Sequence, residues 1–244
     1  MIRRAILLAA GRGARLAPYT DDLPKCLLPL GAGTLLSRQM DACVSVGIDE
    51  LVLVTGYEHE KIEREVARWI SAGGDANVRT VYNPFFATTN NMFSLLLARH
   101  EMDADFLVVN ADNVFSNDAL RTIVTDDAHA ILVPVAIHEA YDAEDMKVRV
   151  VDGKIVEIAK TIPLHEAAGE SIGVRAFRGE GRALLSDELE AMARDSDPAK
   201  AWYITAVSRI AARGGPVGAL YLDSNACMDV DFPEDLERAQ REFG

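Results

Sequence analysis

Short apolar runs alternate with amphipathic stretches along the first half of the chain. Most of these runs carry almost no polar residue, which is typical of strands buried on both faces of a parallel sheet. The predicted strands cover residues 5–10, 51–55, 78–82, 106–110 and 130–135. Helical spacing of apolar residues predicts helices over residues 34–46, 58–71 and 117–125. This alternation predicts an α/β fold with a doubly wound sheet.

The pattern changes after residue 135, where strands and turns replace the regular strand–helix alternation. A hairpin is expected to turn at Asp152-Gly153, because such a pair is typical of two-residue turns between strands. The later elements predicted are strands over residues 148–158, 171–177 and 217–222 and helices over residues 184–194 and 201–213. We therefore expect a mixed, mostly parallel sheet with a small β-rich lid. Because no linker-like composition interrupts the chain, residues 1–244 are expected to form a single domain.

The net charge and the cysteine content exclude several classes of function. The chain has 244 residues and a net charge of −13, which argues against nucleic-acid binding because that function needs a basic face. Any anionic substrate must then be held by a local group of Arg and Lys residues. The scattered cysteines Cys26, Cys43 and Cys227 lack metal-ligand spacing and indicate reduced thiols in the cytoplasm. The run at residues 5–10 is too short for a signal peptide, and no run has the length of a membrane span.

A loop rich in glycine and arginine follows the first predicted strand. Gly11 and Gly13 let the backbone turn tightly, so that successive N–H groups can form an anion-binding concavity. Arg12 and Arg15 add planar groups suited to phosphate. Lys25 follows further along, held between a proline and an apolar run. These residues predict a loop that cradles a polyphosphate, with one lysine aimed at the reacting phosphorus.

Two other phosphate-binding motifs fit this stretch less well. Leu16 stands where the dinucleotide-binding G-x-G-x-x-G motif needs its third glycine, and no Gly-Lys-Ser/Thr follows as in a P-loop. The stretch LAAGRGARLAPYTDDLPKCLLPL instead resembles the G-x-G-x-R-L-x-P-x-T-x-x-x-P-K-x-L motif of the nucleotidyltransferases that make nucleotide sugars and CDP-alcohols. This resemblance implies a Rossmann-like nucleotidyltransferase fold, with Lys25 and Arg15 as catalytic residues. The nucleotide-binding residues that it implies are Ala9, Ala10, Gly11, Arg12 and Gly13.

A polar segment before the next helix offers contacts to a nucleoside. Residues 88–91 and Ser94 carry more hydroxyl and amide groups than the capping of one helix requires. A helix N-terminus that follows a strand is a place where a base or ribose finds hydrogen-bond donors. The pattern NPFFATTNNMFSL resembles the choline-phosphate and phosphonate cytidylyltransferases. The resemblance implies that Asn83, Asn90 and Ser94 contact the nucleoside.

Carboxylates at two distant positions predict a divalent cation site. Asp112 follows an apolar strand, and the carboxyl end of such a strand is where parallel sheets bind ligands. Asp229 and Asp231 alternate on a predicted strand, so both side chains should point to one face and need a neutralising cation. The segment MDVDFPEDL resembles the family's E-I-D-T-P-E-D-L terminus, where an acidic pair closes the metal site. The expected cofactor is Mg²⁺, bound by Asp112, Asp229 and Asp231.

A second group of charged residues surrounds the predicted hairpin. In so acidic a chain, Lys147, Arg149 and Lys160 are suited to capture a second phosphate or phosphonate, although Arg149 equally fits a solvated strand position. The segments DMKV and KTIP, followed by GESIG, resemble the choline-phosphate type of cytidylyltransferase. The resemblance implies acceptor contacts for Lys147 and Lys160, with residues 136–178 as a β-rich extension at the acceptor site. Glu170 would either contact a cationic or hydroxyl group of the acceptor or have a structural role.

The resemblance as a whole implies a Mg²⁺-dependent cytidylyltransferase that transfers CMP from CTP to a small phosphate or phosphonate and releases pyrophosphate. Its partners would be CTP and a small anionic substrate, without nucleic acid or membrane, and the family suggests a homodimer. Phosphocholine, small phosphonates and inositol phosphate are all compatible acceptors. The alternatives are a sugar-1-phosphate uridylyl- or thymidylyltransferase and a non-catalytic nucleotide-binding regulator. Trp202 and Tyr203 would either enclose a cationic group or pack in the core.

Overall fold

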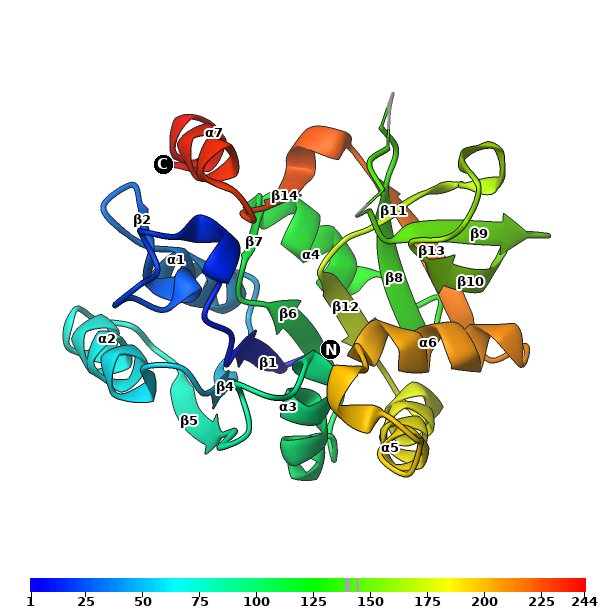
Figure 1. The fold of residues 1–244 in the computed structure, drawn as a ribbon, viewed down its shortest axis with the longest axis horizontal. Coiled ribbons are helices and arrows are strands. Elements are labelled where there is room, and N and C mark those ends of the chain that lie inside the picture. The colour runs from blue at the N-terminus through cyan, green and yellow to red at the C-terminus, as the bar shows by residue number, and fades with distance from the viewer. Residues whose placement is uncertain (139–140, 144) are drawn as a thin grey trace.

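The structure, a computed structural model, describes residues 1–138, 141–143 and 145–244. Residues 139, 140 and 144 of the predicted extension lie outside the described residues. The strands of the central sheet are β1 (Arg4–Ala9), β4 (Glu50–Thr55), β5 (Asn77–Tyr82), β6 (Phe106–Asn110), β8 (Ile131–Ala136), β9 (Lys147–Val151), β10 (Lys154–Ala159), β11 (Gly169–Ser171), β12 (Val174–Phe177) and β13 (Val217–Leu222). Their order is β10-β9-β11-β8-β12-β6-β1-β4-β5, and β13 also pairs with β8 (Figure 1).

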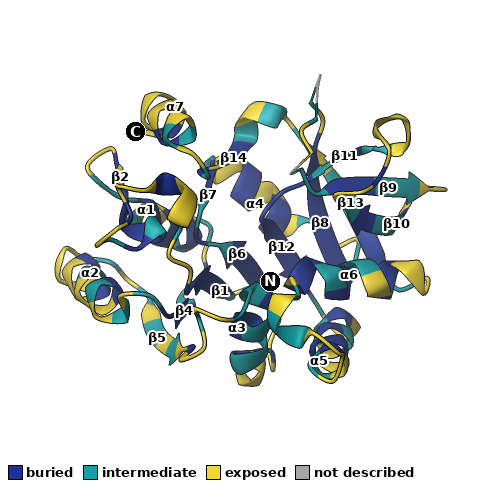
Figure 2. Cartoon of the chain, in the orientation of Figure 1, coloured by how far each residue is buried: buried dark blue, intermediate teal, exposed yellow. Residues whose placement is uncertain are grey.

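Helices cover both faces of this sheet, as the alternating pattern predicts. On one face lie α1 (Leu35–Ser45), α2 (His59–Ser71) and α4 (Asn117–Thr125), and on the other lie α3 (Asn91–Leu97), α5 (Glu180–Met192) and α6 (Tyr203–Ala212). The apolar strands β1, β4 and β6 pair in parallel between the two helical layers. Figure 2 shows these strands as buried, with exposed residues on the outer sides of the helices. The sequence-based fold class is therefore confirmed.

The hairpin predicted after residue 147 is also present. Asp152 and Gly153 form its turn with φ of 50° and 76°, and Lys154 pairs with Val151 directly beside the turn. Strands β9 and β10 join the central sheet through β11, which pairs with both β9 and β8. The extension is thus continuous with the main sheet in the part of the chain that the structure describes.

Two predicted elements of the second half have different bounds. Residues 171–177 do not form one strand, because β11 and β12 are separated at Ile172 and Gly173. The Gly173 carbonyl accepts a hydrogen bond from the Asn110 N–H at 2.9 Å, so the chain changes partners there instead of continuing one ladder. The helix predicted over residues 184–194 begins earlier, at Glu180.

A small separate sheet brings the carboxyl-terminal part of the chain to the tip of β6. In it, β14 (Cys227–Asp229) pairs antiparallel with β7 (Asn113–Phe115), and Asp229 lies opposite Asn113. The prediction that Asp229 and Asp231 share one strand is wrong, because β14 ends at Asp229 and the backbone then turns toward α7 (Pro233–Phe243). In that turn the Asp231 N–H donates to Asp235 Oδ2 at 3.0 Å.

The remaining regular elements are short. Strands β2 (Pro29–Leu30) and β3 (Gly33–Thr34) form a small hairpin before α1. Within the ranges that the structure describes, no helix combines the length and the apolar character needed to cross a membrane.

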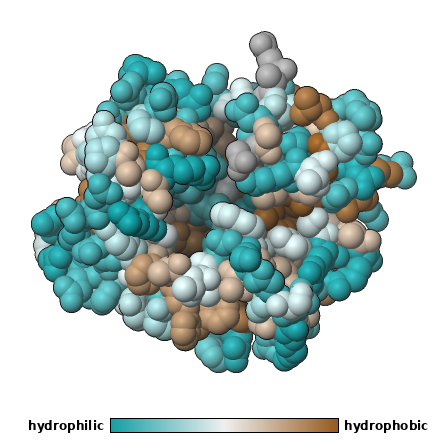
Figure 3. Space-filling model, in the orientation of Figure 1, coloured by the Kyte–Doolittle hydropathy of each residue, from teal (hydrophilic) through white to brown (hydrophobic). Residues whose placement is uncertain are grey.

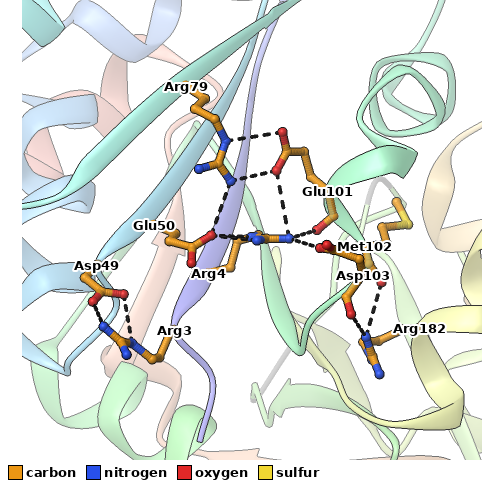
Figure 4. Close-up of polar contacts among 9 residues, drawn as sticks. All are labelled: Arg3, Arg4, Asp49, Glu50, Arg79, Glu101, Met102, Asp103 and Arg182. Carbon is orange, nitrogen blue, oxygen red and sulfur yellow. Dashed lines mark hydrogen bonds and ion pairs between the residues drawn. The ribbon is translucent and has the colours of Figure 1, made fainter.

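An ion-pair network ties several strands together near the start of β1 (Figure 4). The Arg4 guanidinium donates to Glu50 Oε2 at 2.6 Å and to the Glu101 carbonyl at 2.7 Å, and it also contacts the Asp103 carboxylate. Arg79 Nη2 reaches Glu50 at 3.2 Å and Glu101 Oε2 at 2.7 Å. Only 11% of the Arg4 side chain is exposed, so these hydrogen bonds are partly shielded from water.

Replacing Arg4 by methionine should lower the free energy of unfolding by about 1–3 kcal/mol, because carboxylates are left without a partly buried charged donor. Urea unfolding followed by circular dichroism measures this loss. Arg3→Met is the matched control, since Arg3 pairs only with Asp49 among the partners in Figure 4 and its side chain is 69% exposed. Exposed pairs contribute little, so the control should unfold almost as the original does. Equal losses in the two variants would contradict this interpretation.

Candidate active site

A cavity of about 350 Å³ opens where β1 and β6 end. Figure 3 shows this face of the molecule hollowed near its centre, with polar and apolar residues around the opening. Most of the residues predicted for nucleotide binding, catalysis and metal binding line it. They are Ala9, Ala10, Gly11, Gly13, Arg15, Lys25, Asn90, Ser94, Asp112 and Asp231. The carboxyl ends of two parallel strands thus form the site, as in other open α/β sheets.

The glycine-rich loop passes close to Lys25. Gly13 has φ of 76°, and a Cβ atom at this position would lie 2.7 Å from Lys25 Cβ. Only glycine allows both the backbone conformation and this close approach. The fully buried Thr20 hydroxyl donates to the Gly13 carbonyl at 2.8 Å and holds the loop in place. The loop and the lysine therefore form one packed unit.

Lys25 lies between two carboxylates. Its Nζ is 2.9 Å from Asp112 Oδ2 and 2.5 Å from Asp231 Oδ1, and 12% of its side chain is exposed. Burial by itself would lower the pKa of the ammonium, but the charges of Asp112 and Asp231 outweigh it, so the pKa lies above its ordinary value. Lys25 is thus a fixed positive charge at neutral pH, directed into the cavity.

The two arginines of the loop have different partners. Arg15 Nη2 donates to Asp231 Oδ2 at 2.8 Å, and its guanidinium lies 5.2 Å from the centre of the Phe232 ring. Arg12 instead donates to Asp21 at 3.0 Å and is not one of the cavity-lining residues. Asp231 therefore balances Lys25 and Arg15 together.

Asp229 faces a different side of the same region. Its Oδ1 accepts a hydrogen bond from Asn113 Nδ2. The residue is exposed and lines a second cavity, described below. Desolvation of this carboxyl by the enclosing protein, followed by the negative charges of Asp112, Glu170 and Asp231, raises the pKa of Asp229 well above its usual range. The carboxylates of the two distant segments thus lie close enough to affect one another, as the sequence predicts.

The predicted nucleoside contacts occupy different depths. Ser94 lines the cavity, whereas Asn83 lies behind it, fully buried, and donates to the Ser94 and Thr89 hydroxyls at 3.0 and 3.2 Å. Asn90 lines the cavity, and its side-chain amide donates to the Lys200 carbonyl at 2.7 Å. Asn83 therefore supports the wall of the cavity instead of lining it.

Trp202 and Tyr203 have opposite environments. Trp202 is 46% exposed and lines the cavity, and the Asn91 side chain accepts the N–H of Tyr203 at 3.0 Å. Tyr203 is 1% exposed, and its ring lies 5.2 Å from the Arg175 guanidinium, which also donates to its hydroxyl. Core packing is thus the role of Tyr203, and Trp202 alone of the pair can touch a ligand in this cavity.

Cys26 also lines the cavity, next to Lys25 in the chain. Burial raises the pKa of its thiol to about 12, so the thiol stays protonated at neutral pH. Because the thiolate is the nucleophilic form, Cys26 is unsuited to covalent catalysis.

A second, larger cavity of about 670 Å³ shares Arg15 and Asp231 with the first. In its described lining, acidic side chains outnumber the two arginines, Arg15 and Arg238. The acids are Asp142, Asp145, Glu170, Asp229, Asp231, Asp235 and Glu242. Glu170 Oε2 lies 2.9 Å from His138 Nε2, and partial burial followed by the charge of Asp145 raises the pKa of Glu170. This cavity is therefore suited to a positively charged or hydrogen-bond-donating group.

The lysines predicted to bind the acceptor are not among the described residues that line either cavity. Lys147 is 3% exposed and donates to the backbone carbonyls of Asp142 and Asp145 at 3.2 Å, so it holds the acidic loop in place. Lys160 lies exposed just after β10. Arg149 donates to Glu157 across the hairpin at 2.5 Å. Glu170 is the one predicted acceptor residue that faces the larger cavity.

The fit of a metal ion can be judged from the carboxylates. Among the described residues, no three Asp, Glu, His or Cys side chains are grouped so that they could hold a metal ion. Lys25 already lies between Asp112 and Asp231. However, Asp112 Oδ1 is buried and accepts no hydrogen bond, and Asp229 is surrounded by like charges. Carboxylate oxygens with excess negative charge suit Mg²⁺, so the donor set fits this ion in its chemistry.

A known protein family matches most of this chain. The family described as MobA-like NTP transferase domain matches residues 5–196, which include the glycine-rich loop, Lys25 and Asp112. The chain belongs to this family. It is therefore a nucleotidyltransferase by family, and the loop, the lysine and Asp112 lie within the matched domain.

Individual relatives are similar over parts of the chain. The choline-phosphate cytidylyltransferase of Streptococcus pneumoniae is 33% identical over 124 residues, 49% of this chain and 51% of that protein. The CMP-5'-(3-aminopropyl)phosphonate synthase of Streptomyces rubellomurinus is 36% identical over 129 residues, 52% of this chain and 20% of that protein. The chain thus spans about half the length of the first relative and less of the second.

A solved structure matches the nucleotidyltransferase over its whole length. The CTP:phosphocholine cytidylyltransferase LicC of Streptococcus pneumoniae superposes with a TM-score of 0.82 and 23% identity, and the alignment covers 100% of both chains. At this identity the likeness shows a shared fold.

Sequence reasoning missed several polar residues behind the site. Gln39 and Arg175 are 3% exposed, and neither lies in the recognised motifs. One feature of the sequence could have drawn attention to Gln39, because it is a polar residue on the apolar side of a predicted helix. Asn110 also lines the cavity, and its place at the end of β6 could have indicated this.

Proposed function

We propose that this nucleotidyltransferase transfers a cytidylyl group from CTP to a small phosphate or phosphonate acceptor and releases pyrophosphate. The observation that carries the proposal is the placement of Lys25, a fixed cation held against Asp112 and Asp231 and packed on the glycine-rich loop. Similarity to two enzymes named for cytidylyl chemistry supports CTP as the nucleotide. The cavity between the loop and Ser94 offers room for the nucleoside.

The chemistry follows from these charges. An anionic oxygen of the acceptor attacks the α-phosphorus of CTP in line, the bond to the bridging oxygen breaks, and pyrophosphate leaves. Loop N–H groups and Arg15 hold the triphosphate, and Lys25 stabilises negative charge on the α-phosphate oxygens. No general base is needed, because the attacking oxygen is already ionised near neutral pH. Catalysis then depends on positioning and electrostatics.

Magnesium is part of the proposal. Asp112 and Asp229 are the carboxylates that would hold it, because one has a buried oxygen without a donor and the other lies among like charges. Asp231 completes the predicted set, although it also balances Lys25 and Arg15. When bound, the ion would neutralise charge on the phosphate oxygens as a Lewis acid.

We further propose that the acceptor carries a cationic group beside its phosphate or phosphonate. The acidic lining of the larger cavity supports this, because carboxylates such as Asp142, Asp145 and Glu170 would repel a purely anionic ligand. Arg15, which lines both cavities, lies where the anionic end of the acceptor would meet the triphosphate that this arginine holds. Aminoalkylphosphonates and phosphocholine have this combination of charges.

Pyrophosphate release tests the function directly. CTP, UTP, dTTP and ATP are each combined with phosphocholine, 2-aminoethylphosphonate, 2-hydroxyethylphosphonate, phosphonoformate, inositol 1-phosphate and glucose 1-phosphate, in the presence of Mg²⁺. Turnover is expected with CTP and a zwitterionic acceptor. Turnover with UTP or dTTP and the sugar phosphate would favour a sugar-nucleotide enzyme. Nucleotide binding without turnover on any acceptor would favour a regulator.

Replacing Glu170 by glutamine should raise the KM for a zwitterionic acceptor about tenfold, because one charge pair of about 1–2 kcal/mol is lost in a partly enclosed cavity. The KM for CTP should stay unchanged. Steady-state kinetics with both substrates measures the two constants. Glu166→Gln is the control, since Glu166 is exposed on the neighbouring segment and does not line the cavity. A rise of equal size in both KM values would show that Glu170 acts on the fold and not on the acceptor.

A further inference from the structure

Gln39 is a buried amide on the apolar side of α1. It is 3% exposed, and its neighbours on the same buried side include Leu36 and Met40. Its Nε2 donates to the carbonyls of Asn110 and Asn113, at 3.0 and 2.6 Å. These two residues flank the turn that carries Asp112. One helix side chain therefore holds both ends of this turn.

Asn113 makes a similar contact with the carboxyl-terminal segment that carries Asp229. It is fully buried and lies opposite Asp229 in the pairing of β7 with β14. Its Nδ2 donates to Asp229 Oδ1, while its backbone carbonyl accepts from Gln39. A chain of hydrogen bonds thus runs from α1 through the Asp112 turn to Asp229.

The space around Asn113 is also restricted. A Cβ atom at Gly173 would lie 1.7 Å from Asn113 Oδ1, so any other residue there would displace the amide. Buried oxygens that accept no hydrogen bond are concentrated in this region, namely Gln39 Oε1, Asn110 Oδ1, Asp112 Oδ1 and Asn113 Oδ1. Buried polar groups without partners are unfavourable, and such groups often persist where a function requires them.

We propose that Gln39 and Asn113 are positioning residues, which hold the Asp112 and Asp229 carboxylates close to each other. The inference rests on the proposed function, because it assigns the two carboxylates a common divalent ion. These like charges come from segments far apart in the chain, and repulsion would turn them away from each other. Donors fixed by α1 and β7 oppose that movement. Loss of a hydrogen-bond partner that orients a metal ligand typically lowers metal affinity or activity by about 10- to 100-fold.

Asn113→Ala removes the donor to Asp229 and tests the proposal. Binding of Mn²⁺ to the protein, followed by electron paramagnetic resonance without substrate, should weaken by about 10- to 100-fold. The kcat for the best acceptor should fall by a similar factor, whereas CTP affinity measured without divalent ion should change little. Gln39→Met keeps the side-chain length and removes both donors to the turn, and it should shift the same two quantities in the same direction. Gly173→Ala, which displaces Asn113 without replacing it, should do so as well.

Met40→Ala is the matched control. It removes a fully buried apolar side chain from the same helix, and methionine has no N–H or O–H group that could hold the turn, so the variant should lower the melting temperature without changing Mn²⁺ affinity. Unchanged Mn²⁺ affinity in the three test variants, or no Mn²⁺ binding by the original protein, would overturn the proposal. Turnover with none of the acceptors would instead count against the proposed function, because the Mn²⁺ measurement needs no acceptor.

Discussion

Replacing Lys25 by methionine should lower kcat by about 10²- to 10³-fold, as does the loss of a single charged or hydrogen-bonding group that stabilises the transition state. The affinity for CTP should change by less than about threefold, because loop N–H groups and Arg15 still hold the triphosphate. We expect the fall in kcat because of the position of the Lys25 ammonium, which lies 2.9 Å from Asp112 and 2.5 Å from Asp231, while the side chain packs against the loop at Gly13. In the variant, the negative charge that develops on the α-phosphate in the transition state no longer has the Lys25 ammonium as its partner. Binding of CTP in the ground state keeps the loop N–H groups and Arg15.

Methionine is the informative substitution for this test because it retains most of the side-chain volume against Gly13. Single-turnover kinetics and equilibrium CTP binding separate the chemical step from binding. Lys154→Met, an exposed lysine at the start of β10, is the control and should leave both quantities unchanged. If the Lys25 variant turned over at the original rate, the catalytic role would be excluded. A loss of CTP affinity that accounted for the whole effect would make Lys25 a binding residue.

Asp112→Asn should abolish measurable turnover, with a fall in kcat of about 10³-fold or more, because a neutral amide binds Mg²⁺ weakly. The substitution also removes one of the two anions that face Lys25. Added Mg²⁺ should not restore activity if the carboxylate is a ligand of the ion. A titration of kcat against Mg²⁺ concentration measures this, with the fraction of folded protein determined in parallel.

Asp118→Asn serves as the control for the Asp112 variant. Asp118 is exposed in the first turn of α4, shortly after Asp112 in the chain, and lines neither of the two cavities. Its variant should keep the original kcat and the original dependence on Mg²⁺. Full recovery of the Asp112 variant at high Mg²⁺ would indicate that the residue tunes the affinity of a site built by other ligands.

Local patterns predicted much of this protein because they act over short distances. The apolar runs at β1, β4 and β6 can only be buried between two helical layers, so the alternation with amphipathic stretches defined the sheet. The loop from Gly11 to Arg15 was recognisable for the same reason, since its glycines and arginines are neighbours in the chain. The approach of Asp112 to the carboxyl-terminal acids also followed from motif resemblance, and the structure brings these segments together.

The roles of long polar side chains depended on contacts between distant segments. Lys147 and Lys160 were expected at the acceptor site, yet Lys147 turns inward to backbone carbonyls and acidic residues line the larger cavity. Asn83 was expected from the family resemblance to contact the nucleoside, but it is enclosed behind Ser94. A flexible side chain can reach several partners from one backbone position, and the sequence does not state which partner is near.

The amino-acid sequence alone was sufficient to predict the α/β architecture, the glycine-rich loop and the lysine beside it, because each depends on residues close together in the chain. What surrounds these residues depends on the folded chain: Asp231 is shared by Lys25 and Arg15, the second cavity is acidic, and Gln39 supports the Asp112 turn. These features arise where β14 pairs with β7 and α1 packs beneath them. Such pairing is set by the burial and hydrogen bonding of the whole chain, which no local pattern encodes.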